Sequence, residues 1–162
     1  MEIRLARIDD RLIHGQVATV WAKEAGAERI IVVSDEVAAD DIRKTLVRQA
    51  APPGVKVNVV GVDKAVRVYN NPKYEGVTVF YLFVGPQDVL RMVEQGVPIR
   101  SVNIGGMQFK EGRTQVTKAV SVNQEEADTF RKLAGEGIEL DLRCVASDTK
   151  GDFEAKLKDA GF

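Results

Sequence analysis

The chain has 162 residues, and its 23 basic and 24 acidic side chains give a formal net charge of −1. This length fits a single domain, expected over residues 1–162, and the charge balance lacks the basic excess that nucleic-acid binding requires, so nucleic acid is not an expected partner. The longest apolar run, Val77–Val84, is far shorter than the roughly 20 residues that span a bilayer, and the lone Cys144 excludes an internal disulfide, so we expect a soluble cytoplasmic protein.

Apolar runs of strand length alternate with segments whose apolar residues recur every three or four positions. This alternation is typical of repeated βα units around a mainly parallel sheet. We therefore expect a single-domain α/β fold with a central sheet of about seven strands and helices on both faces. The expected strands are Ile3–Ile8, Arg29–Val33, Val55–Val60, Val77–Phe83, Ile99–Ile104, Lys118–Val122 and Ile138–Val145.

The composition of three strands predicts their places in the sheet. Arg29–Val33 and Val77–Phe83 are almost wholly apolar, as expected of central strands covered on both faces. Ile138–Val145 alternates apolar and charged residues, which indicates one solvent-facing side and a place at the sheet edge.

Apolar spacing and end signals predict the helices. One helix before Pro52 is expected to bury a face made by Ala38, Ile42, Leu46 and Ala50. A proline at a first helical position and a glycine after the end predict a second helix over Pro86–Gln95.

A third helix is predicted from its N-terminal cap. Asn123 and Glu126 have the spacing of a capping box, in which each side chain binds the other residue's backbone N–H. Apolar residues at helical spacing follow on one face, at Ala127, Phe130 and Leu133.

The only histidine, His14, lies in the segment Asp9–Gln16, between the first expected strand and a helix. The buried face of that helix is expected to contain Val17, Val20, Trp21 and Ala25. His14 is therefore expected near a helix N-terminus at the carboxyl end of the sheet, where unpaired N–H groups attract anions.

The residues around His14 suit a phosphoryl group. Arg11 offers a fixed positive charge with forked donors, and Gly15 followed by Gln16 lets the loop backbone approach a phosphate closely. A neutral imidazole is a nucleophile near neutral pH, and phosphohistidine passes its phosphoryl group on readily. The pattern favours a transient phosphohistidine at His14.

Asp9 and Asp10 would repel a phosphate. We expect one of them to orient Arg11 or the imidazole N–H of His14, and the other to face solvent or cap the loop. An alternative is a receiver-like signalling domain with a magnesium site at Asp9 and Asp10. The third expected strand does not end in an aspartate and the fifth does not end in a lysine, which such a domain requires.

The loop also allows other interpretations. A lone histidine in a βα loop is compatible with a purely structural hydrogen bond. A single histidine without clustered carboxylates does not form a metal site, and neither G-x-G-x-x-G nor a P-loop occurs, so no metal or cofactor is expected.

Six stretches of the chain, in order from about residue 3 to residue 153, resemble the IIB component of the mannose/fructose/sorbose family of the bacterial sugar phosphotransferase system. These stretches are RIDDRLIHGQV (Arg7–Val17), SDEVAAD (Ser34–Asp40), LVRQAAPPGVKV (Leu46–Val57), NPKYEGVTVFYLF (Asn71–Phe83), GVPIRSVNIGGM (Gly96–Met107) and TKAVSV (Thr117–Val122).

The resemblance implies a cytoplasmic phosphocarrier, peripheral to the membrane through its partners. It would accept a phosphoryl group from a phosphohistidine of a IIA protein or domain and pass it to a hexose imported by membrane IIC and IID components. The resemblance also implies that His14 is phosphorylated on Nδ1, that Arg11 stabilises the transferring group and that Asp9 orients the site. Mannose, fructose and sorbose stay open as substrates.

Further candidates lie at other expected strand ends. Gly105 and Gly106 would bring loop backbone near the phosphate or form a plain tight turn. Phe83 and Gly85 would line the same rim, although a phenylalanine there also fits the core. Arg113 would contact phosphate or an acidic partner or be a solvated charge, and we expect the solvated charge.

A phosphocysteine at Cys144 is an alternative, because other sugar-transport IIB domains use one. It is expected inside the last strand, and Lys150 stands where a phosphocysteine loop would need an arginine. We therefore expect Cys144 to be a small buried packing residue that phosphoryl transfer does not need.

Overall fold

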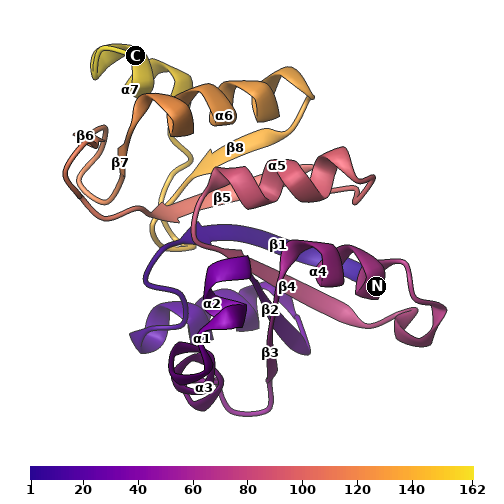
Figure 1. The fold of residues 1–162 in the computed structure, drawn as a ribbon. Helices are drawn as coiled ribbons and strands as arrows, with labels where there is room; N and C mark the ends of the chain where they lie inside the picture. Colours follow the sequence, from indigo (N-terminus) through magenta and orange to yellow (C-terminus); the bar gives the residue numbers. More distant parts are fainter.

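A computed structural model shows a six-stranded, wholly parallel sheet in the order β3-β2-β4-β1-β5-β8 (Figure 1). It describes the backbone of residues 1–162 and the side chains of residues 1–15 and 19–162. The strands are β1 (Glu2–Asp9), β2 (Arg29–Val33), β3 (Lys56–Val60), β4 (Thr78–Phe83), β5 (Ser101–Gly106) and β8 (Glu139–Leu142). The α/β class, the parallel sheet and its covering helices confirm the sequence prediction.

Helices cover both faces of the sheet, which separates two apolar cores. Side chains of α4, α5, α6 and α7 pack into one core, and side chains of α1, α2 and α3 pack into the other. The helices are α1 (Gly15–Ala25), α2 (Asp35–Ala39), α3 (Asp41–Gln49), α4 (Val62–Tyr69), α5 (Pro86–Glu94), α6 (Gln124–Gly135) and α7 (Phe153–Asp159), with a 3₁₀ turn η1 at Pro72–Tyr74.

The sheet has six strands instead of about seven, because the expected strand Lys118–Val122 lies outside it. Only its end, β7 (Ser121–Val122), is a strand, and it pairs antiparallel with β6 (Thr114–Gln115) in a separate two-stranded sheet. The preceding residues instead bind the chain just after β5, where the Met107 N–H donates to the Ala119 carbonyl at 3.0 Å.

The predicted strand positions are confirmed. β2 and β4 are interior strands, and β8 lies at the sheet edge. The last strand is shorter than expected: it ends at Leu142, because the chain turns where the Arg143 N–H donates to the Asp141 carbonyl. Cys144 therefore lies beyond the strand, contrary to the prediction.

Two of the predicted helix features are confirmed. α5 begins at Pro86, and α6 has the complete capping box of Asn123 and Glu126. The apolar residues expected on one face of α6 are buried, namely Ala127, Phe130 and Leu133.

The predicted burial before Pro52 is wrong. Asp40 ends α2 and caps α3, where its carboxylate accepts from the Arg43 N–H, so the expected helix is broken in two. The break turns Ile42 and Leu46 outward, to 77% and 60% exposure, and α3 is anchored by Val47 instead.

The expected face of α1 is also only partly right, because Trp21 is buried whereas Val20 is exposed. Val17, expected on the same face, lies outside the described side chains.

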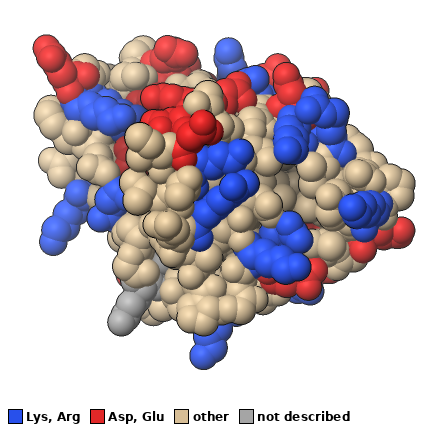
Figure 2. All heavy atoms as spheres, turned by 60° about the horizontal axis from the view of Figure 1, so that its bottom comes forward, with Lys and Arg blue, Asp and Glu red and all other residues tan. Residues whose placement is uncertain are grey.

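The surface carries charges of both signs. In the view of Figure 2, acidic and basic side chains are interspersed with uncharged ones. Within the part of the chain that the structure describes, no helix has the length and apolar character needed to cross a membrane.

Candidate active site

The loop between β1 and α1 begins at the carboxyl end of an interior strand, with β4 on one side and β5 on the other. Its tight path uses left-handed backbone at Leu12 (φ 61°) and Gly15 (φ 51°). A non-glycine residue is strained in this region, and the Leu12 side chain is buried in the apolar core beside α1. His14 then occupies the N-cap position of α1 without using its side chain as the cap.

The carboxylate of Asp9 contacts several residues of this loop and is only 1% exposed. Oδ2 accepts from Arg7 Nη2 at 3.1 Å and lies 3.0 Å from His14 Nε2. Oδ1 accepts from the backbone N–H of Arg11 at 3.1 Å. A buried carboxylate is stable only with such partners, and here they come from both ends of the loop.

Arg7 lies behind Asp9, on the same face of β1, and is also buried. Its Nη1 donates to Asn103 Oδ1 at 2.5 Å and to the Arg143 carbonyl at 3.4 Å, and its guanidinium lies 5.0 Å from the centre of the Trp21 ring. Burial lowers the pKa of Arg7 from its ordinary value, and the charge of Asp9 opposes that shift.

The geometry leaves one face of the site open. The His14 side chain is about a quarter exposed, and its Nε2 contacts Asp9, so Nδ1 is the ring nitrogen turned away from this contact. The Arg11 side chain is 47% exposed, and its Nε lies 3.7 Å from Asp9 Oδ1, a loose contact that leaves the guanidinium free to bind an anion. An imidazole nitrogen and a cation thus flank the start of α1.

Comparison with known proteins identifies the family. Residues 3–162 match the model of the PTS system sorbose subfamily IIB component. The chain is 59% identical to the sorbose-specific EIIB component of Lacticaseibacillus casei, over 97% of this chain and 96% of that one. The crystal structure of the IIBSor domain of the sorbose permease from Klebsiella pneumoniae matches with a TM-score of 0.97 at 57% identity, covering 100% of this chain and 99% of that one.

The chain belongs to the sorbose subfamily of IIB components of the sugar phosphotransferase system. It is also 62% identical to the mannose-specific EIIAB component of Escherichia coli strain K12, over 93% of this chain but 46% of the relative. These matches confirm the resemblance found in the sequence. IIB components are phosphotransferases that act in sugar uptake.

In this IIB component, the second aspartate of the loop belongs to a different network. Asp10 Oδ2 accepts from the Gln108 N–H at 2.8 Å and from Arg113 Nη1 at 3.2 Å, and Arg113 also forms a two-pronged ion pair with Glu126. Arg113 is mostly buried, so the prediction of a solvated charge is wrong. Burial alone would lower the pKa of Arg113, but Glu126 and Asp10 outweigh it and raise the pKa.

The last two residues of β5, Gly105 and Gly106, lie against the Arg7 and Asp9 side chains and do not form a tight turn. A Cβ on Gly105 would lie 2.1 Å from Arg7 Cζ, and a Cβ on Gly106 would lie 3.3 Å from Asp9 Oδ1. The Gly106 carbonyl also accepts from the Asp10 N–H at 3.1 Å. These positions admit the Arg7 and Asp9 side chains.

The remaining candidates have mixed outcomes. Phe83 is fully buried in the core beneath α4, α5, α6 and α7, because every second residue of β4, Phe83 included, faces that layer. The prediction that Phe83 lines the rim of the phosphate site is therefore wrong. Gly85 caps α5 and lines a crevice of about 180 Å³ together with Asp10. Gly15 directly follows His14, and the side chain of Gln16 lies outside the described residues.

A groove of about 770 Å³ runs beside Arg11. The segment after β5 and the β6–β7 hairpin form it, with Phe109, Gln115, Lys118 and Ser121 among its lining. Cys144 lines the same groove and is half-buried, so it is less buried than predicted.

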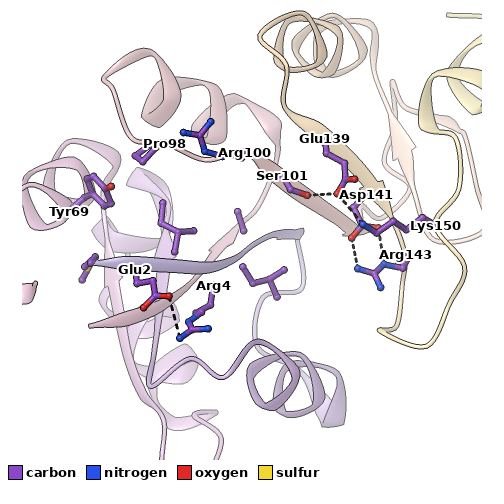
Figure 3. A pocket seen from close by; sticks show the side chains of 14 residues that line it. Glu2, Arg4, Tyr69, Pro98, Arg100, Ser101, Glu139, Asp141, Arg143 and Lys150 are labelled. Carbon is purple, nitrogen blue, oxygen red and sulfur yellow. Dashed lines mark hydrogen bonds and ion pairs between the residues drawn. The ribbon is translucent and has the colours of Figure 1, made fainter. Parts of the chain in front are cut away.

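A second hollow, of about 560 Å³, lies over β1, β5 and β8 (Figure 3). Its walls are polar: Arg143 forms a two-pronged ion pair with Asp141, and Lys150 lies 3.2 Å from Glu139. One residue of its lining, Arg143, also contacts the network around Asp9, because its backbone carbonyl accepts hydrogen bonds from Arg7 and from Asn103.

Proposed function

We propose that this IIB component carries a phosphoryl group on Nδ1 of His14. It accepts the group from a phosphohistidine of a IIA protein or domain and transfers it to a hydroxyl of a hexose that is imported through membrane IIC and IID components. It acts at the cytoplasmic side of the membrane through these partners. The proposal rests on the family, whose relatives include proteins named for sorbose and mannose, and on the geometry of His14.

The observation that carries the proposal is the contact between His14 Nε2 and Asp9 Oδ2 at 3.0 Å. A carboxylate accepts a hydrogen bond, so this contact favours the tautomer with the proton on Nε2. Nδ1 then has a free lone pair and is the nucleophile. In phosphohistidine the proton stays on Nε2, so Asp9 holds the ring in the same way in both states.

The step balances without another reactant. The lone pair of Nδ1 attacks phosphorus as the P–N bond to the donor histidine breaks. In the second step a sugar hydroxyl attacks phosphorus, the P–N bond to His14 breaks with its electron pair returning to Nδ1, and the hydroxyl proton passes to solvent as the phosphate ester forms. Phosphoryl transfer depends mainly on alignment and on donors for the equatorial oxygens.

Arg11 and the start of α1 supply those donors. The exposed guanidinium of Arg11 lies beside the loop, and its planar fork matches phosphate oxygens. α1 begins at Gly15, directly after His14, so the positive end of the helix dipole faces the phosphoryl group.

The receiver-like alternative is not favoured by the side-chain partners. A magnesium site would need the carboxylates of Asp9 and Asp10 together, but Asp9 pairs with Arg7 whereas Asp10 pairs with Arg113. The two carboxylates therefore belong to separate ion pairs.

The test compares untagged wild-type protein with His14→Ala after incubation with a phosphorylated IIA partner. The chain has a single histidine, so a polyhistidine tag must be removed first. Mass spectrometry should show one added phosphoryl group in the wild type, and phosphorus NMR should show a phosphoramidate resonance that is absent from His14→Ala. The phosphate should be labile in acid and stable in base.

Cys144→Ser is the matched control, because this cysteine lines the groove beside Arg11 without belonging to the Asp9 network. It should gain the phosphoryl group as the wild type does. Phosphate on His14→Ala, or an acid-stable phosphate on the wild type, would refute the proposal.

A further inference from the structure

Arg7 is a buried cation directly behind the proposed phosphohistidine. Only 2% of the residue is exposed, and its hydrogen bonds go to Asp9, Asn103 and the Arg143 carbonyl instead of to His14. A charged side chain is rarely buried unless each of its groups is paired, because desolvation costs more than an imperfect pair returns. The partners of the Arg7 guanidinium therefore indicate the role of its charge.

The Arg7 guanidinium is fixed from several directions. Asn103 on β5 and the carbonyl of Arg143 after β8 hold Nη1, while Asp9 takes Nη2 at 3.1 Å. Trp21 of α1 lies against the guanidinium at 5.0 Å. These contacts hold the plane of the guanidinium from three sides, and Nη2 is the nitrogen that meets Asp9.

Gly105 provides the space for this arrangement. A Cβ at position 105 would lie 2.1 Å from Arg7 Cζ and 2.3 Å from both terminal nitrogens. Any side chain there would displace the guanidinium. The φ angle of Gly105 is not left-handed, so close approach of Arg7 accounts for the glycine.

Resting on the proposed function, we propose that Arg7 is a positioning residue for phosphoryl transfer. Its guanidinium fixes the Asp9 carboxylate so that Oδ2 receives the Nε2–H of His14, which keeps Nδ1 as the reactive nitrogen. Arg7 and His14 Nε2 both meet the same oxygen, at 3.1 and 3.0 Å, so the orientation of the carboxylate set by Arg7 is passed directly to the imidazole.

Arg7 also keeps Arg11 available. Arg11 Nε lies only 3.7 Å from Asp9 Oδ1, and Asp9 without Arg7 would be a buried carboxylate lacking a full counter-charge. Arg11 would then be drawn onto Asp9 and away from the phosphoryl oxygens. By neutralising Asp9 from behind, Arg7 leaves the exposed guanidinium for the transferring group.

The test measures two properties of Arg7→Met, which keeps the length of the side chain but removes the charge and the fork. We expect phosphorylation by a phosphorylated IIA partner to be slower by about tenfold or more, because a displaced reacting group loses alignment. We also expect nitrogen-15 NMR of the ring to show loss of the single Nε2–H tautomer. With one histidine in the chain, both ring signals belong to His14. Arg7→Lys should recover part of the rate.

Gly105→Ala provides the second arm, since it displaces the Arg7 guanidinium without changing any charge. It should reproduce both the slower transfer and the altered tautomer. Gly135→Ala is its matched control: a Cβ at that helical position meets nothing within 4 Å, so rate and tautomer should stay as in the wild type.

Each outcome decides the inference. If Arg7→Met folds, as judged by circular dichroism, a wild-type rate or a wild-type tautomer overturns it, since Arg7 would then not act through His14. If Arg7→Met does not fold, Gly105→Ala decides by the same criteria. Failure of the wild type to be phosphorylated on His14 would instead refute the proposed function, and the tautomer measurement does not depend on that result.

Discussion

Asp9 and Asp10 are consecutive, yet their carboxylates join different networks. Asp9 faces Arg7, His14 and the backbone of Arg11, whereas Asp10 faces Arg113 and the Gln108 N–H. Successive residues at a strand end point to opposite sides of a sheet, which separates the two carboxylates. The same kind of pair, an aspartate with a buried arginine, thus occurs twice in neighbouring positions.

The third member of each network distinguishes the two pairs. On the Asp9 side it is the imidazole of His14, and on the Asp10 side it is Glu126 in the first turn of α6. The Asp9 pair can therefore orient a reactive group, while the Asp10 pair ties the loop to a helix. The role of a buried ion pair is therefore indicated by the third group that it contacts, more than by its charge or its burial.

Replacing the first aspartate should have the largest effect. Asp9→Ala leaves Arg7 buried without its counter-charge and His14 without its acceptor, so the free energy of unfolding should fall by about 3–5 kcal/mol. Phosphoryl transfer should fall by roughly a hundredfold or more in the folded fraction. Urea unfolding and transfer from a phosphorylated IIA partner measure the two effects. Asp152→Ala, which removes only the cap of α7, should lower stability by about 1 kcal/mol and leave transfer unchanged.

Removing the arginine of the second pair should affect stability and spare the chemistry. Arg113→Met leaves Asp10 and Glu126 facing each other without a cation, and the free energy of unfolding should fall by about 3 kcal/mol. Transfer at low temperature should change by less than about threefold, since Asp9 and His14 keep their partners. A loss of transfer as large as that of Asp9→Ala would abolish the distinction between the two aspartates.

The exposed arginine on the Asp9 side should show the reverse behaviour. Arg11→Lys keeps the charge but loses the planar fork, so transfer should slow by roughly tenfold or more. Its side chain is half-exposed, so the free energy of unfolding should change by less than about 0.5 kcal/mol. Single-turnover rates test the slower transfer, and thermal unfolding tests the unchanged stability. A near-normal transfer rate would remove Arg11 from the mechanism.

A surface pair should give the smallest effect. Hydrogen bonds from Arg91 and from the Val62 N–H lower the pKa of Asp35 in the folded protein. The ionised carboxylate therefore stabilises the fold at pH values above the pKa that Asp35 has in the unfolded chain. This contribution is lost as the pH falls through the lower pKa of the folded state. Both side chains are well exposed, so Asp35→Asn should cost less than about 0.5 kcal/mol near pH 6. Unfolding curves at decreasing pH should show that this difference shrinks as the Asp35 carboxylate becomes protonated, and a difference that grew on acidification would contradict the sign.

Local patterns predicted most of the fold, where neighbours in sequence determine the structure. The apolar runs of β2 and β4 and the capping box of α6 depend on residues within a few positions of one another. The break between α2 and α3 was missed because Asp40 competes as a cap with a helical apolar pattern that otherwise continues across it. Ile42 and Leu46 were therefore assigned to the wrong face.

The site was predictable to the same extent. Asp9, Arg11 and His14 lie within six consecutive residues, so their association could be expected from the sequence. Arg7 was missed, because a charged residue in a strand gives no sign of burial by itself. Its partners Asn103 and Arg143 are 96 and 136 positions away and become neighbours only when β5 and β8 join the sheet. The available signal was the glycine pair at 105 and 106, which directly follows the expected strand Ile99–Ile104.

The position of β1 in the sheet also constrains how the phosphorylated state is recognised. This strand is hydrogen-bonded on both sides, by β4 and by β5. Backbone amides in such a strand exchange with solvent mainly through global opening, so the segment that ends at Asp9 is among the most rigid parts of the chain. Loading and unloading His14 should therefore leave its support unmoved. We expect a partner to distinguish the two states by the phosphoryl group itself and by exposed side chains such as Arg11, without any refolding of the carrier.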